Sequence, residues 1–136
     1  MFFDSHAHLD FDAFDADREA VIQRAKDNGL LFIINIAIDL AGTRNSIGLA
    51  KDYPEYIFAT AGIHPNYSAD LVEAQFTDLE KLARAPEVVA IGEIGLDYYR
   101  DHATPQQQRV ALEKQLDLAR RLALLIVVHE RASAHE

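Results

Sequence analysis

The sequence predicts an α/β fold built from parallel βα repeats. Short apolar runs alternate with amphipathic segments of helical length throughout the chain. Polar residues that can bind metals or move protons stand where several of these runs stop, at residues 6–8, 93 and 129. Parallel strands need long crossovers, and parallel α/β folds place their sites at the carboxyl ends of strands. Both patterns therefore favour one parallel sheet with its site at one end.

The apolar runs predict five strands, at residues 2–8, 31–38, 56–63, 88–94 and 124–129. The second run is apolar along most of its length, which is typical of a strand covered on both faces. Strand alternation puts four polar residues of the first run on one face: Asp4, His6, His8 and Asp10. A parallel sheet is usually covered on both faces, so this polar face indicates a site.

The amphipathic segments predict four helices, at residues 17–27, 41–52, 71–84 and 104–121. The fourth has the clearest start, because Thr104 and Gln107 have capping-box spacing and proline occupies the first helical position. We expect its inward face to contain Leu112, Leu116 and Ala119. Five strands and four helices amount to about half of a (β/α)8 TIM barrel, which typically needs about 250 residues.

Length and composition narrow the class of protein. The 136 residues suit a single domain, residues 1–136, and a hydrophobic content of 49% favours a folded core. The sequence has no cysteine, no signal peptide and no apolar stretch long enough to cross a bilayer, so we expect a soluble cytoplasmic protein. The net charge of −9 argues against a broad basic groove for nucleic acid, although bound divalent metals can supply local positive charge.

Four residues are candidate metal ligands. His6 and His8 are two residues apart, so their rings can converge on one ion beyond the strand end. Glu93 ends a buried run between glycines, and a glutamate that faces two metals can bridge them. His129 follows an apolar run, and neutral imidazole is the commonest ligand for zinc-like metals. The alternatives are a solvated carboxylate for Glu93 and a capped strand end for His129.

His64 ends the third predicted strand, and we expect it to contact a phosphate or a reacting water. His102 and His135 lie in loop or tail contexts and are expected to be solvated. The sequence has no phosphate-binding loop, no dinucleotide fingerprint and no Gly-x-Ser-x-Gly elbow. These absences argue against nucleotide-binding enzymes and serine hydrolases of those types.

Four motifs, in this order, carry a resemblance to a known family: FDSHAHLD at 3–10, AGIHP at 61–65, AIGEIGLDYY at 90–99 and VVHER at 127–131. Together they resemble the TatD family of metal-dependent deoxyribonucleases, within the amidohydrolase-like TIM-barrel hydrolases. The resemblance covers essentially the whole chain, but only about the first half of the family's fold. It implies hydrolysis of DNA phosphodiesters by metal-activated water.

The resemblance also implies a cofactor and a set of ligands. Two divalent ions are expected, Mg, Mn or Zn. His6 and His8 would hold one ion, His129 would hold the other, and Glu93 would bridge them. Asp4 would orient a histidine through its ring N–H.

Other residues receive roles in substrate binding and catalysis. The resemblance implies that His64 and Arg131 contact the scissile phosphate, with His64 and Glu93 as the catalytic residues. Asp97 and the following tyrosines would shape the loop over the site. The family takes a further histidine and a catalytic aspartate from later strands, which these 136 residues do not contain. The chain is therefore a fragment of a longer enzyme or a natural truncation with altered function.

Two other functions stay open at this point. The chain could be a non-catalytic half-barrel that binds metal weakly or self-associates, as a homodimer, through the exposed edges of its sheet. It could also be an amidohydrolase-like esterase or phosphoesterase, since related barrels begin with similar His-x-His motifs. The glycine–glutamate motif around Glu93 favours the nuclease family.

Overall fold

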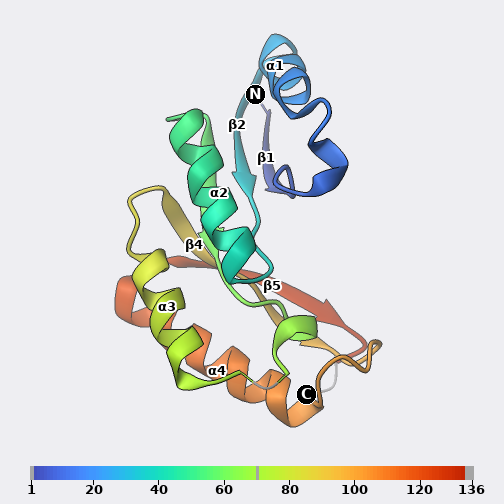
Figure 1. Cartoon of the computed structure of the whole chain (residues 1–136), viewed down its shortest axis with the longest axis vertical. Helices are drawn as coiled ribbons and strands as arrows, with labels where there is room; N and C mark the ends of the chain where they lie inside the picture. Colours follow the sequence, from blue (N-terminus) through green and yellow to red (C-terminus); the bar gives the residue numbers. More distant parts are fainter. Residues whose placement is uncertain (1, 70, 134–136) are drawn as a thin grey trace.

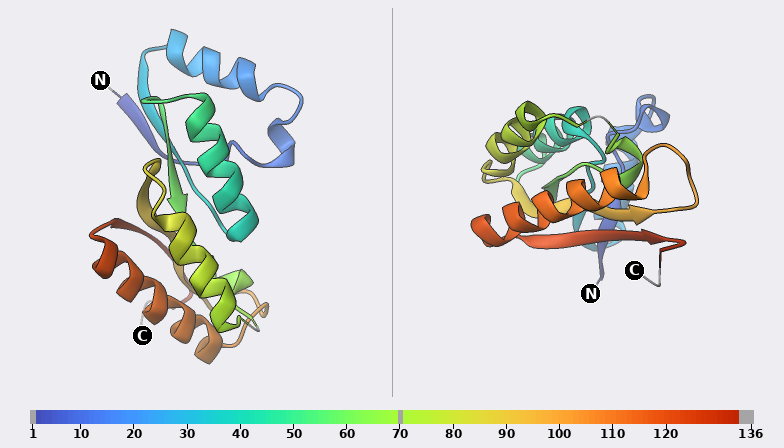
Figure 2. Two further views of the ribbon diagram at one scale, coloured as in Figure 1. Left: turned by 60° about the vertical axis from the view of Figure 1, so that its left-hand side comes forward. Right: turned by 90° about the horizontal axis from the view of Figure 1, so that it is seen from below.

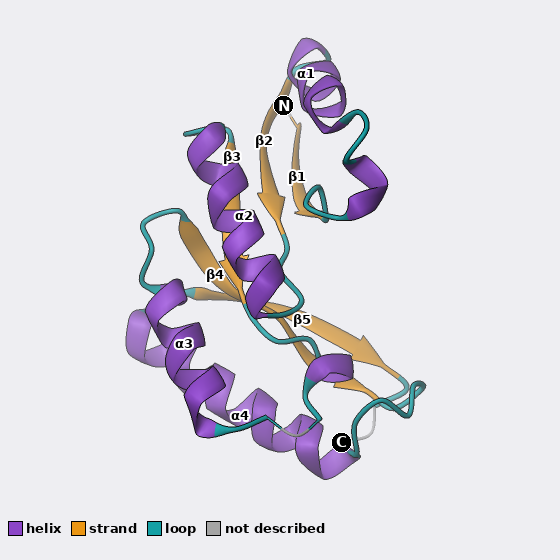
Figure 3. Ribbon diagram, viewed as in Figure 1, coloured by secondary structure: helices purple, strands orange, loops and turns teal. Residues whose placement is uncertain are grey.

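The computed structural model describes residues 2–69 and 71–133 (Figures 1 and 3). Its strands are β1 (Phe2–Ala7), β2 (Leu30–Asn35), β3 (Ile57–Ala61), β4 (Val88–Asp97) and β5 (Leu125–Arg131). Its helices are α1 (Arg18–Asp27), α2 (Leu40–Asp52), α3 (Glu73–Ala83) and α4 (Pro105–Leu122), with short 3-10 turns at Asp12–Phe14 and Pro65–Tyr67. Within the described residues, no helix has the length and apolar character needed to cross a membrane.

The five strands form one parallel sheet in the order β1-β2-β3-β4-β5. Helices α2, α3 and α4 lie on the same side of this sheet (Figure 2), with α2 packed on β3 and α4 packed on β4. The core fills the space between the two layers and includes Ile33, Ile57, Leu79, Ile91 and Leu118. The predicted α/β half-barrel is therefore confirmed.

The strand ends differ from the sequence prediction where they matter for the site. β4 runs on to Asp97, three residues beyond the expected end, because β5 continues beside it up to the pair Asp97 and Arg131. β1 ends at Ala7, so His8 and Asp10 follow the strand. The expectation that Asp10 shares the polar face of β1 is wrong, since its carboxylate accepts from Asn35 Nδ2 at 2.7 Å in the turn after the strand.

The expectation that the strands are covered on both faces is also wrong. In β2, Leu31 is 46% exposed, and the edge strands are more open still. Phe2 of β1 is 77% exposed, and Leu125 and Val128 of β5 are 73% and 57% exposed. The helices cover one side of a sheet whose two outer strands have no neighbour beyond them in the described chain.

The buried face of α4 is rotated relative to the prediction. Leu116 is 39% exposed, whereas Ala119 is buried as expected and Leu112 packs against the core. Where Leu116 was expected, the helix instead buries two glutamines. These are Gln108 and Gln115. Their side chains hydrogen-bond to backbone groups of the sheet ends, which determines the side of α4 that faces inward.

Gly95 allows β4 and β5 to approach closely at the site. Its φ of +146° lies in a region that side-chain-bearing residues rarely adopt. A Cβ at this position would overlap the carbonyl oxygen of His129. The glycine therefore lets β5 bring His129 close to the backbone of β4.

Gly95→Ala should lower the free energy of unfolding by roughly 2–4 kcal/mol, because strain and overlap with β5 act together. Gly48→Ala is the matched control, since Gly48 lies within α2 and an added Cβ meets nothing within 4 Å. That substitution should stabilise the protein by about 0.5–1 kcal/mol. Urea unfolding of both variants checks the prediction, and an equal effect of the two substitutions would contradict it.

Candidate metal centre

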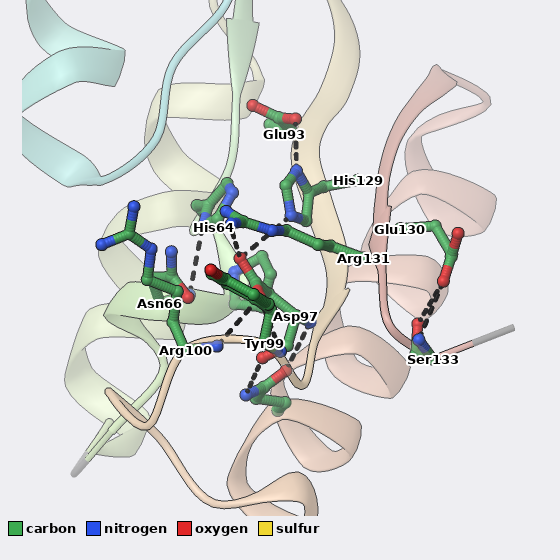
Figure 4. Close-up of polar contacts among 12 residues, drawn as sticks. His64, Asn66, Glu93, Asp97, Tyr99, Arg100, His129, Glu130, Arg131 and Ser133 are labelled. Carbon is green, nitrogen blue, oxygen red and sulfur yellow. Dashed lines mark hydrogen bonds and ion pairs between the residues drawn. The ribbon is translucent and has the colours of Figure 1, made fainter.

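The sheet brings the predicted site residues together from four strands. His6 lies on β1 and His8 just after it, His64 follows β3, Glu93 lies on β4 and His129 on β5. Glu93, His64 and His129 lie close together in Figure 4. These five residues form two clusters whose potential ligand atoms lie within 4.8 Å of one another: His6, His8 and Glu93, and His64, Glu93 and His129.

The backbone around Glu93 is held by the neighbouring strands. The Glu93 N–H donates to the Ala37 carbonyl, 2.7 Å away, just beyond β2. The Thr60 hydroxyl on β3 donates to the Gly92 carbonyl at 2.6 Å and accepts from the Ala37 N–H at 2.9 Å. Thr60 is fully buried, so these bonds are shielded from water and fix Glu93 relative to β2 and β3.

In the first cluster, two imidazoles face one carboxylate oxygen. His6 Nε2 lies 3.7 Å and His8 Nε2 4.0 Å from Glu93 Oε2. His8 Nδ1 is 2.9 Å from the Ile36 carbonyl, so the ring hydrogen of neutral His8 is donated there. This leaves the Nε2 lone pair directed toward Glu93, which is the arrangement of a metal-binding histidine.

In the second cluster, His129 lies between two carboxylates. Its Nδ1 is 3.1 Å from Glu93 Oε1 and its Nε2 is 3.2 Å from Asp97 Oδ2. A neutral ring that donates Nε2–H to Asp97 turns the lone pair of Nδ1 toward Glu93. Asp97 would thereby orient His129, in addition to shaping the loop.

Burial raises the pKa of Asp97, but its hydrogen bonds outweigh this effect. His129 and the backbone N–H groups of Tyr99 and Arg100 all contact its carboxylate. Together they hold the pKa below its ordinary value of 3.8. Asp97 is therefore ionised near neutral pH, as acceptance of a ring N–H requires.

His64 is placed as a hydrogen-bond donor. It is buried, and its ring lies 4.3 Å from that of His129, centroid to centroid. Its Nδ1 accepts from the Asn66 N–H at 3.1 Å, so the hydrogen of the neutral ring is on Nε2. Burial, with repulsion from His129 next in size, lowers the pKa of His64 from 6.5 to about 4. A neutral Nε2–H suits the predicted contact with a phosphate or water better than metal ligation.

Asp4 and Arg131 occupy the edge of the site. Asp4 Oδ1 accepts from the backbone N–H of His6 at 2.9 Å, so its contact is to the main chain where the resemblance implied a ring N–H. The guanidinium of Arg131 lies 3.9 Å from the centroid of the Tyr99 ring, and its Nη1 is 4.0 Å from Asp97 Oδ2. The Arg131 side chain is 41% exposed, so it can reach a ligand from solvent.

The chemistry of these groups fits two divalent metal ions. Glu93 is 8% exposed, and a buried carboxylate is costly unless positive charge compensates it. Its two oxygens face different histidines, Oε2 toward His6 and His8 and Oε1 toward His129. Imidazole nitrogen and carboxylate oxygen are ligands of zinc, manganese and similar ions.

Two buried glutamines of α4, Gln108 and Gln115, bond the backbone next to this site and were not among the residues expected from the sequence. The signal was polar residues seven positions apart within the helix, which the apolar pattern of its leucines obscured. The other two histidines considered lie apart from the clusters. His102 is exposed, as predicted, and His135 lies outside the described residues.

A parallel half-barrel with imidazoles and a shared carboxylate at its strand ends defines an α/β-barrel protein with a candidate two-metal centre. The family model described as TatD related DNase matches residues 3–136. The chain therefore belongs to the TatD related DNase family.

Individual relatives agree with this family. The protein named 3'-5' ssDNA/RNA exonuclease TatD from Erwinia tasmaniensis is 36% identical over 98% of this chain and 51% of its own length. A Bacillus subtilis protein named uncharacterized metal-dependent hydrolase YabD is 33% identical over 100% of this chain and 53% of its own. The structure of YJJV, a TatD homolog from Escherichia coli, is 34% identical with a TM-score of 0.88, covering 97% of this chain and 51% of that chain. The chain thus spans about half the length of the relatives it matches.

The lowered pKa of His64 predicts a pH dependence of stability. The folded protein binds a proton on His64 less tightly than the unfolded chain does, because the pKa falls from 6.5 to about 4. Its contribution to stability is therefore complete above pH 6.5 and is lost as the pH falls toward 4. We expect a loss of roughly 1–3 kcal/mol over that interval in metal-free buffer.

Urea unfolding with a chelator present measures this loss. His64→Gln removes the titrating ring and should flatten the pH dependence, whereas His102→Gln, in an exposed loop, should leave it unchanged. A wild-type slope in the His64 variant would show that the prediction is wrong.

Proposed function

We propose that this chain is a metal-dependent hydrolase that acts on DNA phosphodiesters, with residues 1–136 forming one domain. The observation that carries the proposal is the position of Glu93, whose two oxygens each face a different group of imidazoles. His6 and His8 would hold one divalent ion, His129 the other, and Glu93 would bridge them. Magnesium, manganese and zinc are the candidate ions, and the predicted cytoplasmic location stays a prediction.

The side chains around the clusters supply complementary functions. Bound divalent ions would lower the pKa of water and stabilise charge on phosphate oxygens. His64 would donate Nε2–H to a phosphate oxygen or to the attacking water. Arg131, held against Tyr99, would bind the phosphate through its guanidinium, a group suited to paired contacts with phosphate oxygens. Asp97 would keep the His129 ring oriented.

Single-stranded DNA is the substrate we propose to try first. The Erwinia tasmaniensis relative is named as a 3'-5' ssDNA/RNA exonuclease, and this chain is 36% identical to half of it. The chain has a net negative charge, so a broad basic surface does not bind the DNA. Bound metal ions and Arg131 would supply the positive charge that contacts the phosphates.

Glu93→Gln is expected to abolish both Mn²⁺ binding and Mn²⁺-dependent hydrolysis of a labelled single-stranded oligonucleotide. The substitution keeps the shape of the side chain but removes the charge that both clusters share. Glu130→Gln is the matched control. Glu130 lies beside His129 on β5, but its carboxylate accepts hydrogen bonds from Ser133 rather than facing the clusters. Calorimetric titration and product analysis read the two properties separately. Equal Mn²⁺ affinity in wild type and Glu93→Gln would contradict the proposal.

The open edge strands support a second candidate function, self-association of the half-barrel. Phe3, Phe32 and Phe58 form a row across β1, β2 and β3, with ring centroids 4.7 and 5.8 Å apart, and Phe3 is 54% exposed. Leu125 at the other edge is 73% exposed. Apolar side chains on unpaired parallel strands are suited to burial against another strand. We propose a homodimer formed through these edges.

Sedimentation velocity should show a species of twice the 15.2 kDa chain mass. Leu125→Lys should shift the protein toward the monomer, because a charge would be buried at the strand edge. Leu116→Lys provides the control, as Leu116 is a partly exposed leucine on the surface of α4. A monomeric wild type at the highest usable concentration would rule out this association.

A further inference from the structure

Two glutamines on α4 occupy positions that an ordinary amphipathic helix gives to apolar residues. Gln108 and Gln115 are each 1% exposed. They lie seven residues apart, which is about two helical turns and places them on one face. Burying an amide side chain is unfavourable unless its polar atoms find partners, so these positions call for a specific reason.

Gln115 binds both backbone polar groups of Ile63. The Ile63 N–H donates to Gln115 Oε1 at 2.7 Å, and Gln115 Nε2 donates to the Ile63 carbonyl at 3.0 Å. Ile63 lies two residues beyond the end of β3 and directly before His64. The side-chain amide thus replaces a neighbouring strand at the point where the chain turns into the site.

Gln108 makes the same pair of bonds to Asp97. The Asp97 N–H donates to Gln108 Oε1 at 2.8 Å, and Gln108 Nε2 donates to the Asp97 carbonyl at 3.0 Å. The last residue of β3 to pair with β4 is Ala61, opposite Ile91, so β4 extends beyond β3 before it reaches Asp97. Gln108 again supplies the partner that a strand would have supplied.

The two held segments carry two groups that lie next to His129. The His64 ring lies 4.3 Å from the His129 ring, and Asp97 Oδ2 lies 3.2 Å from His129 Nε2. Two bonds from one planar amide fix both the position and the rotation of the residue they hold. A single helix therefore bonds the backbone that carries two of the neighbours of His129, while the third, Glu93, is held by β2 and β3.

We propose that Gln108 and Gln115 are positioning residues of the metal centre. Gln108 sets the carboxylate that orients His129, and Gln115 sets the ring that faces the reacting groups. The inference rests on the metal site of the proposed function, and it gives α4 a part in that site which acts through the backbone of Ile63 and Asp97. Groups of this kind around metal ligands usually affect metal affinity by 10–100-fold when removed.

The first experiment measures Mn²⁺ affinity of the 136-residue chain by calorimetric titration. Gln108→Met and Gln115→Met keep the length of the side chain and remove all its hydrogen bonds. Gln108→Met should weaken binding about 10–100-fold, because Asp97 orients the ligand His129. Gln115→Met should leave the affinity nearly unchanged, because His64 is not a ligand, and its effect is read at the His64 ring below. Gln106→Met, at an exposed position of the same helix, should change nothing. Leu118→Ala should lower Tm through a core cavity yet leave affinity unchanged. Wild-type affinity in Gln108→Met, or an equal loss in Leu118→Ala, would overturn the role of Gln108.

A second measurement needs no metal, and it separates failure of this inference from failure of the proposed function. Histidine ring NMR signals should shift for His129 in Gln108→Met and for His64 in Gln115→Met, with neither shifted in Gln106→Met. If the wild type binds no Mn²⁺, the proposed function fails and these signals alone decide the positioning role. Unchanged ring signals in both glutamine variants would overturn it. If the methionine variants do not fold, Gln108→Asn and Gln115→Asn replace them, because their neutral amides are one methylene too short to make both backbone bonds. The same rings should then shift relative to wild type, and unshifted rings would overturn the proposal.

Discussion

The buried carboxylate of Glu93 is the constraint on which the rest of the site depends. A carboxylate that is 8% exposed must be surrounded by groups that compensate its charge. The histidines that face it come from the two edge strands of the sheet, β1 and β5. Thr60 and Ala37 hold the backbone on either side of the Gly92–Glu93 peptide bond. Because Glu93 lies on β4, one of its oxygens faces His6 and His8 from the first strand region and the other faces His129, which is 36 positions further along the chain.

The close packing of β4 against β5 follows from the same requirement. Gly95 lets the backbone of β5 approach, and the pairing of Gly95 with His129 sets the imidazole level with the carboxylates of β4. Asp97 at the end of β4 then reaches the second ring nitrogen. Helix α4 completes this arrangement from outside the sheet. Its glutamines bond the backbone at Ile63, beyond the end of β3, and at Asp97, where β4 has extended past β3.

The length of the relatives and the open edges of the sheet both indicate that this chain forms half of a barrel. The relatives are about twice as long as this chain, and the edge strands β1 and β5 expose apolar side chains. Phe2, Leu125 and Val128 have the character of barrel-core residues without the surface that would bury them. The metal clusters nevertheless form within the described strands, because their ligands come from β1, β4, β5 and the segment after β3.

The sequence by itself determined the order of strands and helices, the family and the residues of the two clusters. The hydrophobic periodicity and the positions of His6, Glu93 and His129 at or near strand ends depend only on neighbouring residues. They can therefore be read from the sequence without a structure. The tertiary structure decided what depends on distant partners: the true end of β4, the exposure of β2 and Leu116, and the backbone contact of Asp4. It also revealed Gln108 and Gln115, whose burial makes physical sense only once the ends of β3 and β4 lie beside α4.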